Sequence, residues 1–193
     1  MRARRARPED AGAIHLLIAH YAAQELLLPR TEDEIRAHIR RFLVLTQKTE
    51  GGHETLPPPV SQQTAQSRER LLGCVALEPY GADLAEIRSL AVDPEIRGRG
   101  LGARLLQAAL ATARRRKIAR VFAVTHAPEF FARQGFAVST RRALPEKIAR
   151  DCRACPKARA CELVAVIAVV CPDRVARHGG AVLAVASKPA HAV

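Results

Sequence analysis

Three glycines within five residues, Gly98, Gly100 and Gly102, separate a strand candidate that ends at Val92 from an amphipathic helix candidate. Glycine permits backbone angles that direct successive N–H groups into one concavity, and the start of a helix adds further unpaired N–H groups. The segment therefore predicts a cradle for a phosphate or pyrophosphate group. The alternative is a tight strand-to-helix turn that binds nothing.

Two common phosphate-binding motifs do not fit this turn. A dinucleotide-binding fingerprint requires G-x-G-x-x-G, but Leu105 stands where the third glycine belongs. A P-loop requires Gly-Lys followed by Ser or Thr, and the turn lacks this sequence. Neither nucleotide fold is therefore expected.

The order of apolar patterns predicts a mixed α/β (α+β) fold with a single central sheet flanked by helices. Thr31 and Glu34 have the spacing of a capping box at the start of a helix. Strands are expected at 3–7, 43–45, 72–77, 84–92, 121–125, 136–139 and 163–170. Helices are expected from Pro8, from Thr31, and at 101–116, 128–134 and 145–151.

The length of 193 residues fits one domain, which we place at 1–171. Residues 46–70 are rich in Gly, Pro, Gln, Thr and Ser and predict a flexible inserted loop, while 172–193 form a tail. The apolar runs are too short to cross a bilayer, and the basic N-terminus lacks the apolar stretch of an export signal. We expect a cytoplasmic protein without a membrane partner.

The net charge of +12 suggests an anionic partner. Arginine is so abundant, however, that this charge looks like a compositional bias. Aromatic residues make up only 4% of the chain, and basic motifs with interleaved aromatics are missing. A nucleic-acid partner is therefore not expected, and a homodimer stays open as the assembly state.

The pattern Arg97-x-x-Gly100-x-Gly102 after Val-Asp-Pro resembles the acetyl-CoA-binding motif of the GNAT acetyltransferases. The stretch from Phe130 to Phe136 is similar to the closing signature of that family. The resemblance covers roughly 3–170 and implies a GNAT fold with a splay between the two central strands. It implies that acetyl-CoA is the cosubstrate. The pyrophosphate would bind the backbone of Arg97, Gly98, Arg99, Gly100, Leu101, Gly102 and Ala103, and the pantetheine arm that of Leu90, Ala91 and Val92.

Several segments, among them 24–31, 82–92 and 144–146, resemble the acetyltransferase part of the N-acetylglutamate synthases. This implies an amino-acid N-acetyltransferase that makes N-acetyl-L-glutamate in arginine biosynthesis. Larger members carry an arginine-sensing, kinase-like domain, which we do not expect here. The alternatives are acetylation of a protein N-terminus, a lysine, a polyamine or an antibiotic, or a non-catalytic module that binds acyl-CoA or nucleic acid.

Glu86 is the candidate catalytic base. An α-ammonium group must lose a proton before it attacks a thioester, and a nearby carboxylate can take that proton directly or through water. Strand alternation predicts that Glu86, Arg88, Leu90 and Val92 share one face. The alternative is a structural carboxylate paired with an arginine.

A dicarboxylate acceptor needs cationic anchors, and the arginine fork suits carboxylates. Arg30 matches the family's carboxylate-binding arginine, and Arg88, Ser89 and Lys157 (or Arg159) are further substrate-binding candidates. Thr125 aligns with a hydroxyl residue that the family assigns to the departing thiolate, with His126 as an alternative. The chain's two tyrosines, Tyr21 and Tyr80, do not lie at the family's usual tyrosine position.

The spacing C-x2-C-x5-C of Cys152, Cys155 and Cys161 leaves three interpretations open. The cysteines can hold a structural zinc ion, although a fourth ligand such as Cys74 or Cys171 would be required. They can form a redox pair that gates the site, or they can be thiols without a special role.

Overall fold

The computed structural model describes residues 2–48, 69–153, 155 and 161–175. Its centre is one seven-stranded sheet with the order β1-β2-β3-β4-β5-β7-β6. Neighbouring strands are antiparallel except β4 and β5, which are parallel. The strands are β1 (Arg2–Arg5), β2 (Phe42–Lys48), β3 (Glu69–Pro79), β4 (Leu84–Val92), β5 (Arg120–Thr125), β6 (Ala137–Ser139) and β7 (Val164–Val169).

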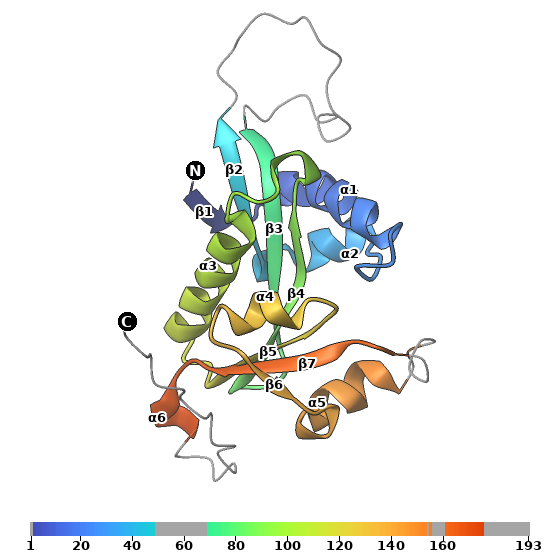
Figure 1. Cartoon of the computed structure of the whole chain (residues 1–193). Coiled ribbons are helices and arrows are strands. Elements are labelled where there is room, and N and C mark those ends of the chain that lie inside the picture. Colours follow the sequence, from blue (N-terminus) through green and yellow to red (C-terminus); the bar gives the residue numbers. More distant parts are fainter. Residues whose placement is uncertain (1, 49–68, 154, 156–160, 176–193) are drawn as a thin grey trace, which may run out of the picture.

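Helices cover both faces of this sheet, as the sequence predicts (Figure 1). The α-helices are α1 (Ala11–Ala22), α2 (Glu32–Ala37), α3 (Leu101–Arg115), α4 (Pro128–Ala132), α5 (Pro145–Lys147) and α6 (Pro172–Val175). Short 3-10 turns occur at Pro8–Asp10, Ile39–Arg41, Pro94–Ile96 and Arg141–Ala143. The helix expected at 145–151 is α5 followed by a π-helical turn at Ile148–Cys152, a difference that periodicity alone does not reveal.

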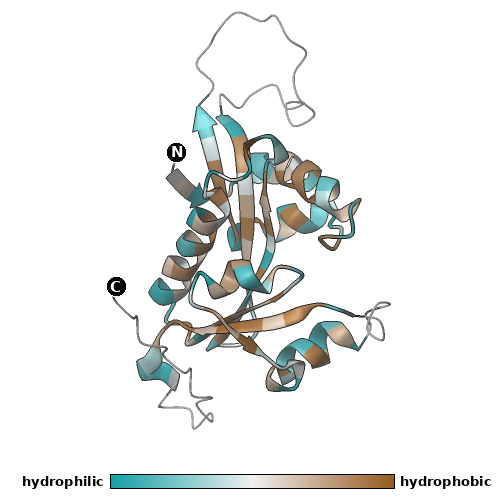
Figure 2. Ribbon diagram, in the orientation of Figure 1, coloured by the Kyte–Doolittle hydropathy of each residue, from teal (hydrophilic) through white to brown (hydrophobic). Residues whose placement is uncertain are grey.

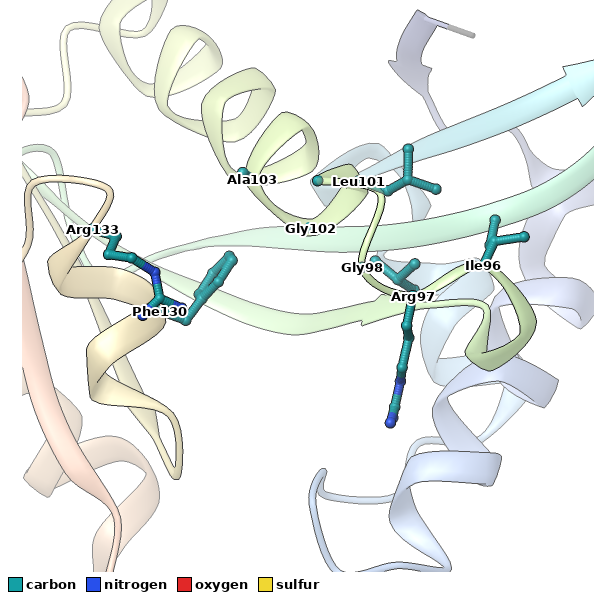
Figure 3. A pocket seen from close by; sticks show the side chains of 10 residues that line it. Ile96, Arg97, Gly98, Leu101, Gly102, Ala103, Phe130 and Arg133 are labelled. Carbon is teal, nitrogen blue, oxygen red and sulfur yellow. The ribbon is translucent and has the colours of Figure 1, made fainter.

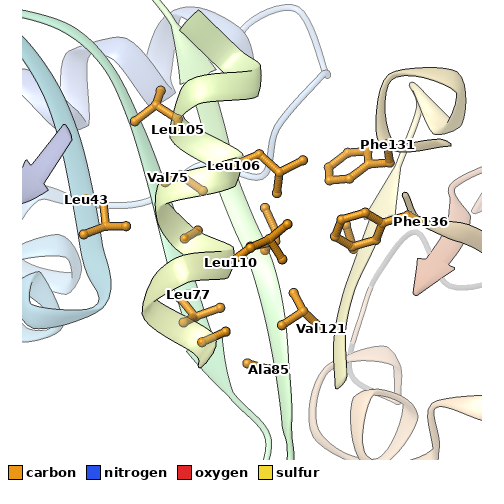
Figure 4. Close-up of a cluster of buried hydrophobic side chains, with 14 of the residues drawn as sticks. Leu43, Val75, Leu77, Ala85, Leu105, Leu106, Leu110, Val121, Phe131 and Phe136 are labelled. Atoms are coloured by element: carbon orange, nitrogen blue, oxygen red, sulfur yellow. The ribbon is translucent and has the colours of Figure 1, made fainter. Parts of the chain in front are cut away.

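Two apolar clusters lie on opposite faces of the sheet. Helix α3 buries Leu105, Leu106 and Ala109 against strands β2 to β5, where Phe131 and Phe136 close the cluster (Figure 4). Helices α1 and α2 cover the other face with a separate cluster. The ribbon of α3 alternates between hydrophobic and hydrophilic colours, because one stripe of the helix packs and the other meets solvent (Figure 2).

The predicted capping box starts α2. Glu34 receives a hydrogen bond on its carboxylate from the Thr31 backbone N–H at 2.9 Å, and its own N–H donates to the Thr31 hydroxyl at 3.2 Å. This reciprocal pair satisfies two of the N–H groups that a helix start leaves open. It also fixes the loop that leads from α1 to α2, where Arg30 lies.

Strands β4 and β5 separate after a short paired region, which confirms the predicted splay. Their parallel register covers only Leu84 to Glu86 opposite Arg120 to Phe122. Strand β4 continues to Val92, while β5 continues to Thr125 on β7. The second half of β4 is therefore no longer paired with β5, and the edge of β4 that β5 has left faces the splay.

A β-bulge in β4 corrects the predicted alternation. Ser89 and Leu90 together lie opposite Val75 of β3, and Ser89 has φ of +50°, a left-handed conformation that a non-glycine residue rarely adopts. The extra residue reverses the alternation of side chains along β4. Leu90 and Val92 therefore pack with Ile87 on the α3 side. The prediction that these two residues share a face with Glu86 is therefore wrong.

The inserted loop and the tail are described only at their ends. Strand β2 extends to Lys48 and β3 begins at Glu69, so the predicted loop is shorter at both ends, and its residues 49–68 lie outside the described part. Of the tail, the structure describes residues 172–175, which form α6, and Arg174 there pairs with Asp83 at 3.0 Å. Within the described part, no helix combines the length and the apolar character needed to span a bilayer.

Candidate active site

The glycine turn forms one wall of a pocket of about 330 Å³. The opposite wall is formed by Phe130 of α4 and by Arg133, which directly follows α4 (Figure 3). Gly98 and Gly100 have φ of +80° and +70°, which L side chains rarely adopt, and a Cβ atom at either position would meet no atom within 4 Å. The turn therefore holds a backbone conformation that needs glycine, and it leaves space beside the start of α3. These features fit the predicted pyrophosphate cradle.

Most of the predicted cradle residues line this pocket, which also includes Val92 and Ile96. Those residues are Arg97, Gly98, Gly100, Leu101, Gly102 and Ala103. Arg99 does not belong to the lining, and neither do Leu90 and Ala91 on β4. The Ala91 side chain is buried under α1 and α2, so only the backbone of that residue is suited to a ligand in the splay.

Tyr21 of α1 ties the end of β4 to the turn. Its hydroxyl donates to the Val92 carbonyl and accepts from Arg97 Nε at 3.0 Å. The Arg97 guanidinium also lies over the Tyr21 ring, 4.8 Å from its centroid. A helix on one face of the sheet thus positions the first residue of the cradle, an arrangement that the sequence analysis missed.

Glu86 lies beside the splay and is almost completely buried, with 3% of its surface exposed. Its Oε2 accepts hydrogen bonds from the Tyr80 hydroxyl at 2.9 Å and from Lys147 Nζ at 3.0 Å, and it also pairs with Arg88 Nε. Burial works against the charge of Arg88, yet the adjacent Glu86 carboxylate raises the pKa of that guanidinium above its ordinary value. Glu86 is therefore a buried carboxylate held by three donors.

Asp151 completes this cluster from the π-helical turn. Its Oδ2 accepts from Lys147 Nζ at 2.7 Å and also contacts the Tyr80 hydroxyl and the Arg88 guanidinium. Burial alone would raise the pKa of Asp151, but hydrogen bonds from Lys147 and Tyr80 lower it overall. Residues that are far apart in the chain thus form one network, which we call the Glu86 cluster: Tyr80, Glu86, Arg88, Lys147 and Asp151.

A second buried carboxylate adjoins the Glu86 cluster. Glu78 of β3 lies directly across from Glu86 in the strand register and is 4% exposed. It accepts two hydrogen bonds from Arg41, at 2.6 and 2.7 Å, and pairs with Arg150. Burial of Glu78 would raise its pKa, but these two arginines lower it. The two carboxylates are therefore neutralised by different cations.

Arg30 is the predicted anchor without a direct ion-pair partner among the described residues, although the charges of Glu78, Glu34 and Glu86 act on it from a distance. The residue is half-buried in the α1–α2 loop, where its carbonyl accepts a hydrogen bond from His15 Nδ1 at 2.8 Å. Its guanidinium has no hydrogen bond or ion pair to any residue in the described ranges. Burial lowers the pKa of Arg30, and the nearby Arg88 lowers it further. Such a cation is suited to receive an anionic group from a ligand.

The remaining predicted site residues have diverse positions. Thr125 ends β5, and its hydroxyl accepts from the Ala127 N–H at 3.0 Å, while His126 next to it is exposed. Ser89 forms the bulge, and its carbonyl accepts from the Cys74 thiol. Lys157 and Arg159 lie outside the described residues. Sequence reasoning also missed Lys147 and Asp151, although their i, i+4 spacing could have suggested a pair.

The cysteine motif gains no support as a metal site. No group of three or more His, Cys, Asp or Glu side chains that could hold a metal ion occurs among the residues with a described placement. Cys74, considered as a fourth ligand, is buried in the cluster beneath α1, and burial raises the pKa of its thiol to about 12. A structural zinc ion, one of the three interpretations of the motif, is therefore unsupported in the described part of the chain.

A parallel strand pair that splays apart, a glycine-lined pocket at the end of β4 and a buried carboxylate on β4 agree with the fold that the GNAT resemblance implies. The profile of the acetyltransferase (GNAT) family matches residues 21–136, which is more than half of the chain. The chain therefore belongs to the GNAT family and is an N-acetyltransferase.

Two curated relatives illustrate how similar the chain is to known proteins. An uncharacterized N-acetyltransferase of Chlorobaculum tepidum is 35% identical over 85% of this chain and 93% of its own length. The amino-acid acetyltransferase of Mycobacterium tuberculosis is 34% identical over 69% of this chain and 66% of its own length. Amino-acid acetyltransferases of Neisseria meningitidis also match, but the chain spans only 30% of their length.

Solved structures agree with this assignment. The N-acetylglutamate synthase of Neisseria gonorrhoeae, in complex with coenzyme A and N-acetyl-glutamate, superposes with a TM-score of 0.69 at 28% identity. The match covers 87% of this chain and 34% of the synthase. A Mycobacterium tuberculosis protein in complex with CoA and NLQ gives a TM-score of 0.66 at 26% identity, over 88% of this chain and 99% of that one.

Proposed function

We propose that the chain is an acetyl-CoA-dependent amino-acid N-acetyltransferase and that its acceptor is L-glutamate. The observation that carries the acceptor assignment is the charge around Arg30. Glu78, Glu86 and Asp151 are paired with four cations, namely Arg41, Arg88, Lys147 and Arg150, and Arg30 adds a fifth positive charge without a partner in the described part. Glu34, which also acts on Arg30, is exposed and caps α2.

This excess of positive charge favours an anionic acceptor. Glutamate with a neutral amine, the form that attacks a thioester, carries two carboxylates and a charge of about −2. Its carboxylates can form charge-assisted hydrogen bonds with arginine. A polyamine or a lysine side chain would be repelled by the same cations. The positive surroundings also favour loss of the ammonium proton, because a nearby cation destabilises a second one.

Acetyl-CoA fits the pocket on the α3 side of the splay. We assign its pyrophosphate to the backbone N–H groups from Arg97 to Ala103, and its pantetheine arm to the edge of β4 from Leu90 to Val92. The conformations of Gly98 and Gly100 and the open space beside them support this assignment. The acetyl thioester would then lie in the splay, between the cradle and Glu86.

Glu86 is the proposed base for the acceptor ammonium. Because its carboxylate already accepts three hydrogen bonds, we expect the proton to reach it through a lone pair that these donors leave open, directly or by way of water. Thr125 is the proposed hydrogen-bond donor to the departing thiolate. Its hydroxyl accepts from Ala127, and this contact leaves its own proton available for donation.

A panel of acceptors assayed with acetyl-CoA tests the proposal. Release of the coenzyme A thiol is followed for glutamate, glutamine, aspartate, lysine, a polyamine and a peptide, and the products are identified by mass. Glutamate should give the highest kcat/KM. If the polyamine or the peptide is acetylated and glutamate is not, the acceptor assignment is wrong and the family assignment remains.

A further inference from the structure

A proton that reaches Glu86 has to leave it again before the next turnover. The Glu86 side chain is only 4% exposed, so little of its carboxylate meets bulk water. While the acceptor occupies the splay, the proton can leave through a neighbour that both accepts and donates a proton. This argument rests on the proposed function, in which Glu86 deprotonates the acceptor.

Among the described neighbours of Glu86 in the Glu86 cluster, Tyr80 is the one that meets this requirement. Arg88 and Lys147 also bind the carboxylate, but a guanidinium and an ammonium can only donate hydrogen bonds. A phenolic hydroxyl donates one proton and accepts through its lone pairs. Burial and then the negative charge of Glu86 raise the pKa of Tyr80 well above its ordinary value, so the hydroxyl keeps its proton.

The Tyr80 hydroxyl lies between two carboxylates. It is 2.9 Å from Glu86 Oε2 on one side and in contact with Asp151 Oδ2 on the other. Since the hydroxyl has a single proton, it can donate to one carboxylate at a time, and it accepts from Glu86 only when Glu86 carries a proton. The Asp151 side chain is 26% exposed and therefore connects this path to solvent.

We propose that Tyr80 and Asp151 form the exit path for the proton that Glu86 takes from the acceptor. The N–H bond of the ammonium breaks and an O–H bond forms on Glu86. That proton then moves to the Tyr80 oxygen while the original Tyr80 proton moves to Asp151, which releases it to water. Each step transfers one proton, every group returns to its starting state, and no further reactant is needed.

The surroundings hold the Tyr80 ring in the position that this path requires. The ring packs edge-to-face on Phe122 at 5.3 Å, and the Arg150 guanidinium lies 4.2 Å from its centroid. The charged groups that face the hydroxyl are Glu86 and Arg88 from β4 and Lys147 and Asp151 from the α5 region. Tyr80→Phe keeps the ring contacts and removes the hydroxyl, together with the hydrogen bonds that it accepts from Arg88 and Lys147.

The test measures kcat, both KM values and the solvent isotope effect in H2O and D2O for the wild type and Tyr80→Phe. We expect kcat to fall about tenfold to a hundredfold, within the range of a lost proton-transfer group, with both KM values changed less than about twofold. The solvent isotope effect on kcat should rise, because proton release becomes rate-limiting. Asp151→Asn should have the same effects. The control is Asp83→Asn, which should retain the wild-type kcat, because Asp83 lies in the same hairpin as Tyr80 but pairs with Arg174.

A double variant separates proton transfer from structural support. In a Glu86→Gln background no proton enters the path, so adding Tyr80→Phe should lower kcat by less than about twofold. A wild-type kcat in Tyr80→Phe, or a lower kcat with an unchanged isotope effect, would overturn the proposal. All variants are assayed with the best acceptor of the wild type. If glutamate is not acetylated, the acceptor assignment is refuted. The ratio of kcat in Tyr80→Phe to kcat in the wild type still tests the exit path.

Discussion

Replacing Arg30 with alanine should separate acceptor binding from fold stability. A buried arginine usually holds a partner carboxylate, so its removal leaves that carboxylate uncompensated. The Arg30 guanidinium makes no ion pair among the residues whose placement is described. Removing it therefore leaves no protein group without its ion-pair partner. The loss of binding energy should appear only when an anionic acceptor binds.

The expected size follows from the contact that is lost. A hydrogen bond to a charged group contributes about 1.5–3 kcal/mol, which corresponds to about tenfold to a hundredfold in affinity. Arg30→Ala should therefore raise KM for glutamate by this factor and leave KM for acetyl-CoA nearly unchanged. If Arg30 binds the side-chain carboxylate, the preference of the enzyme for glutamate over glutamine should also disappear in the variant.

Arg30→Ala should weaken the binding of glutamate without lowering the stability of the fold. Burial and Arg88 lower the pKa of Arg30, which means that the folded state disfavours its charge. We expect the melting temperature of Arg30→Ala to equal or exceed that of the wild type. Arg41→Ala is the matched control, because it takes a partner from the buried Glu78 carboxylate and should cost about 1–3 kcal/mol of folding free energy.

Steady-state kinetics and thermal unfolding of both variants provide the measurement. A KM for glutamate that stays within twofold of the wild type in Arg30→Ala would remove this residue from the acceptor site. A drop in melting temperature as large as that of Arg41→Ala would show that Arg30 has a structural partner after all. Either result would refute this reasoning about Arg30.

Four further predictions concern the base, the cradle, acid stability and thiol reactivity. Glu86→Gln should lower kcat about a hundredfold at neutral pH, and the loss should shrink in rate measurements at high pH, where the acceptor amine is already neutral. Gly100→Val should abolish coenzyme A binding in calorimetry while circular dichroism stays native, because valine is strained at φ of +70° and its side chain would enter the space of the cradle. Burial would raise the pKa of Glu78, but its arginine partners lower it below the ordinary value of 4.5. Glu78 therefore stabilises the fold above that pH, the contribution disappears as the pH falls through the folded pKa, and Glu78→Gln should flatten the acid side of a plot of melting temperature against pH. Cys74 should react with a thiol reagent only in denaturant, as mass spectrometry of the labelled protein can test, because its thiol is buried and its pKa is about 12.

Local signals predicted the parts of the fold that short-range physics determines. The extent of β4 (Leu84–Val92), the capping box of Thr31 and the glycine turn all depend on neighbours a few residues away in the chain. The apolar stripe of α3 likewise repeats within each turn of the helix. The splay followed from the family motif, and the structure confirms it, while the assignment of the glycine turn to a pyrophosphate stays a prediction.

The parts that were missed depend on contacts between distant segments. The bulge at Ser89 arises from pairing with β3, and no residue type at that position signals a left-handed conformation. The Glu86 cluster joins the hairpin that contains Tyr80 to the turn that contains Asp151, which are 71 positions apart in the sequence. Alternation and composition describe single segments, and therefore neither reveals such a network.

The bulge in β4 has a consequence for how an enzyme of this kind can change its acceptor. Before the bulge, Glu86 and Arg88 face the polar cluster, and after it Leu90 and Val92 face the α3 side. One strand thus carries two short stretches whose side chains contact different neighbours. Under the proposed function, substitutions in the first stretch would act on the acceptor, while the second stretch keeps its packing on the α3 side. Such a strand lets its polar side and its α3 side be substituted separately.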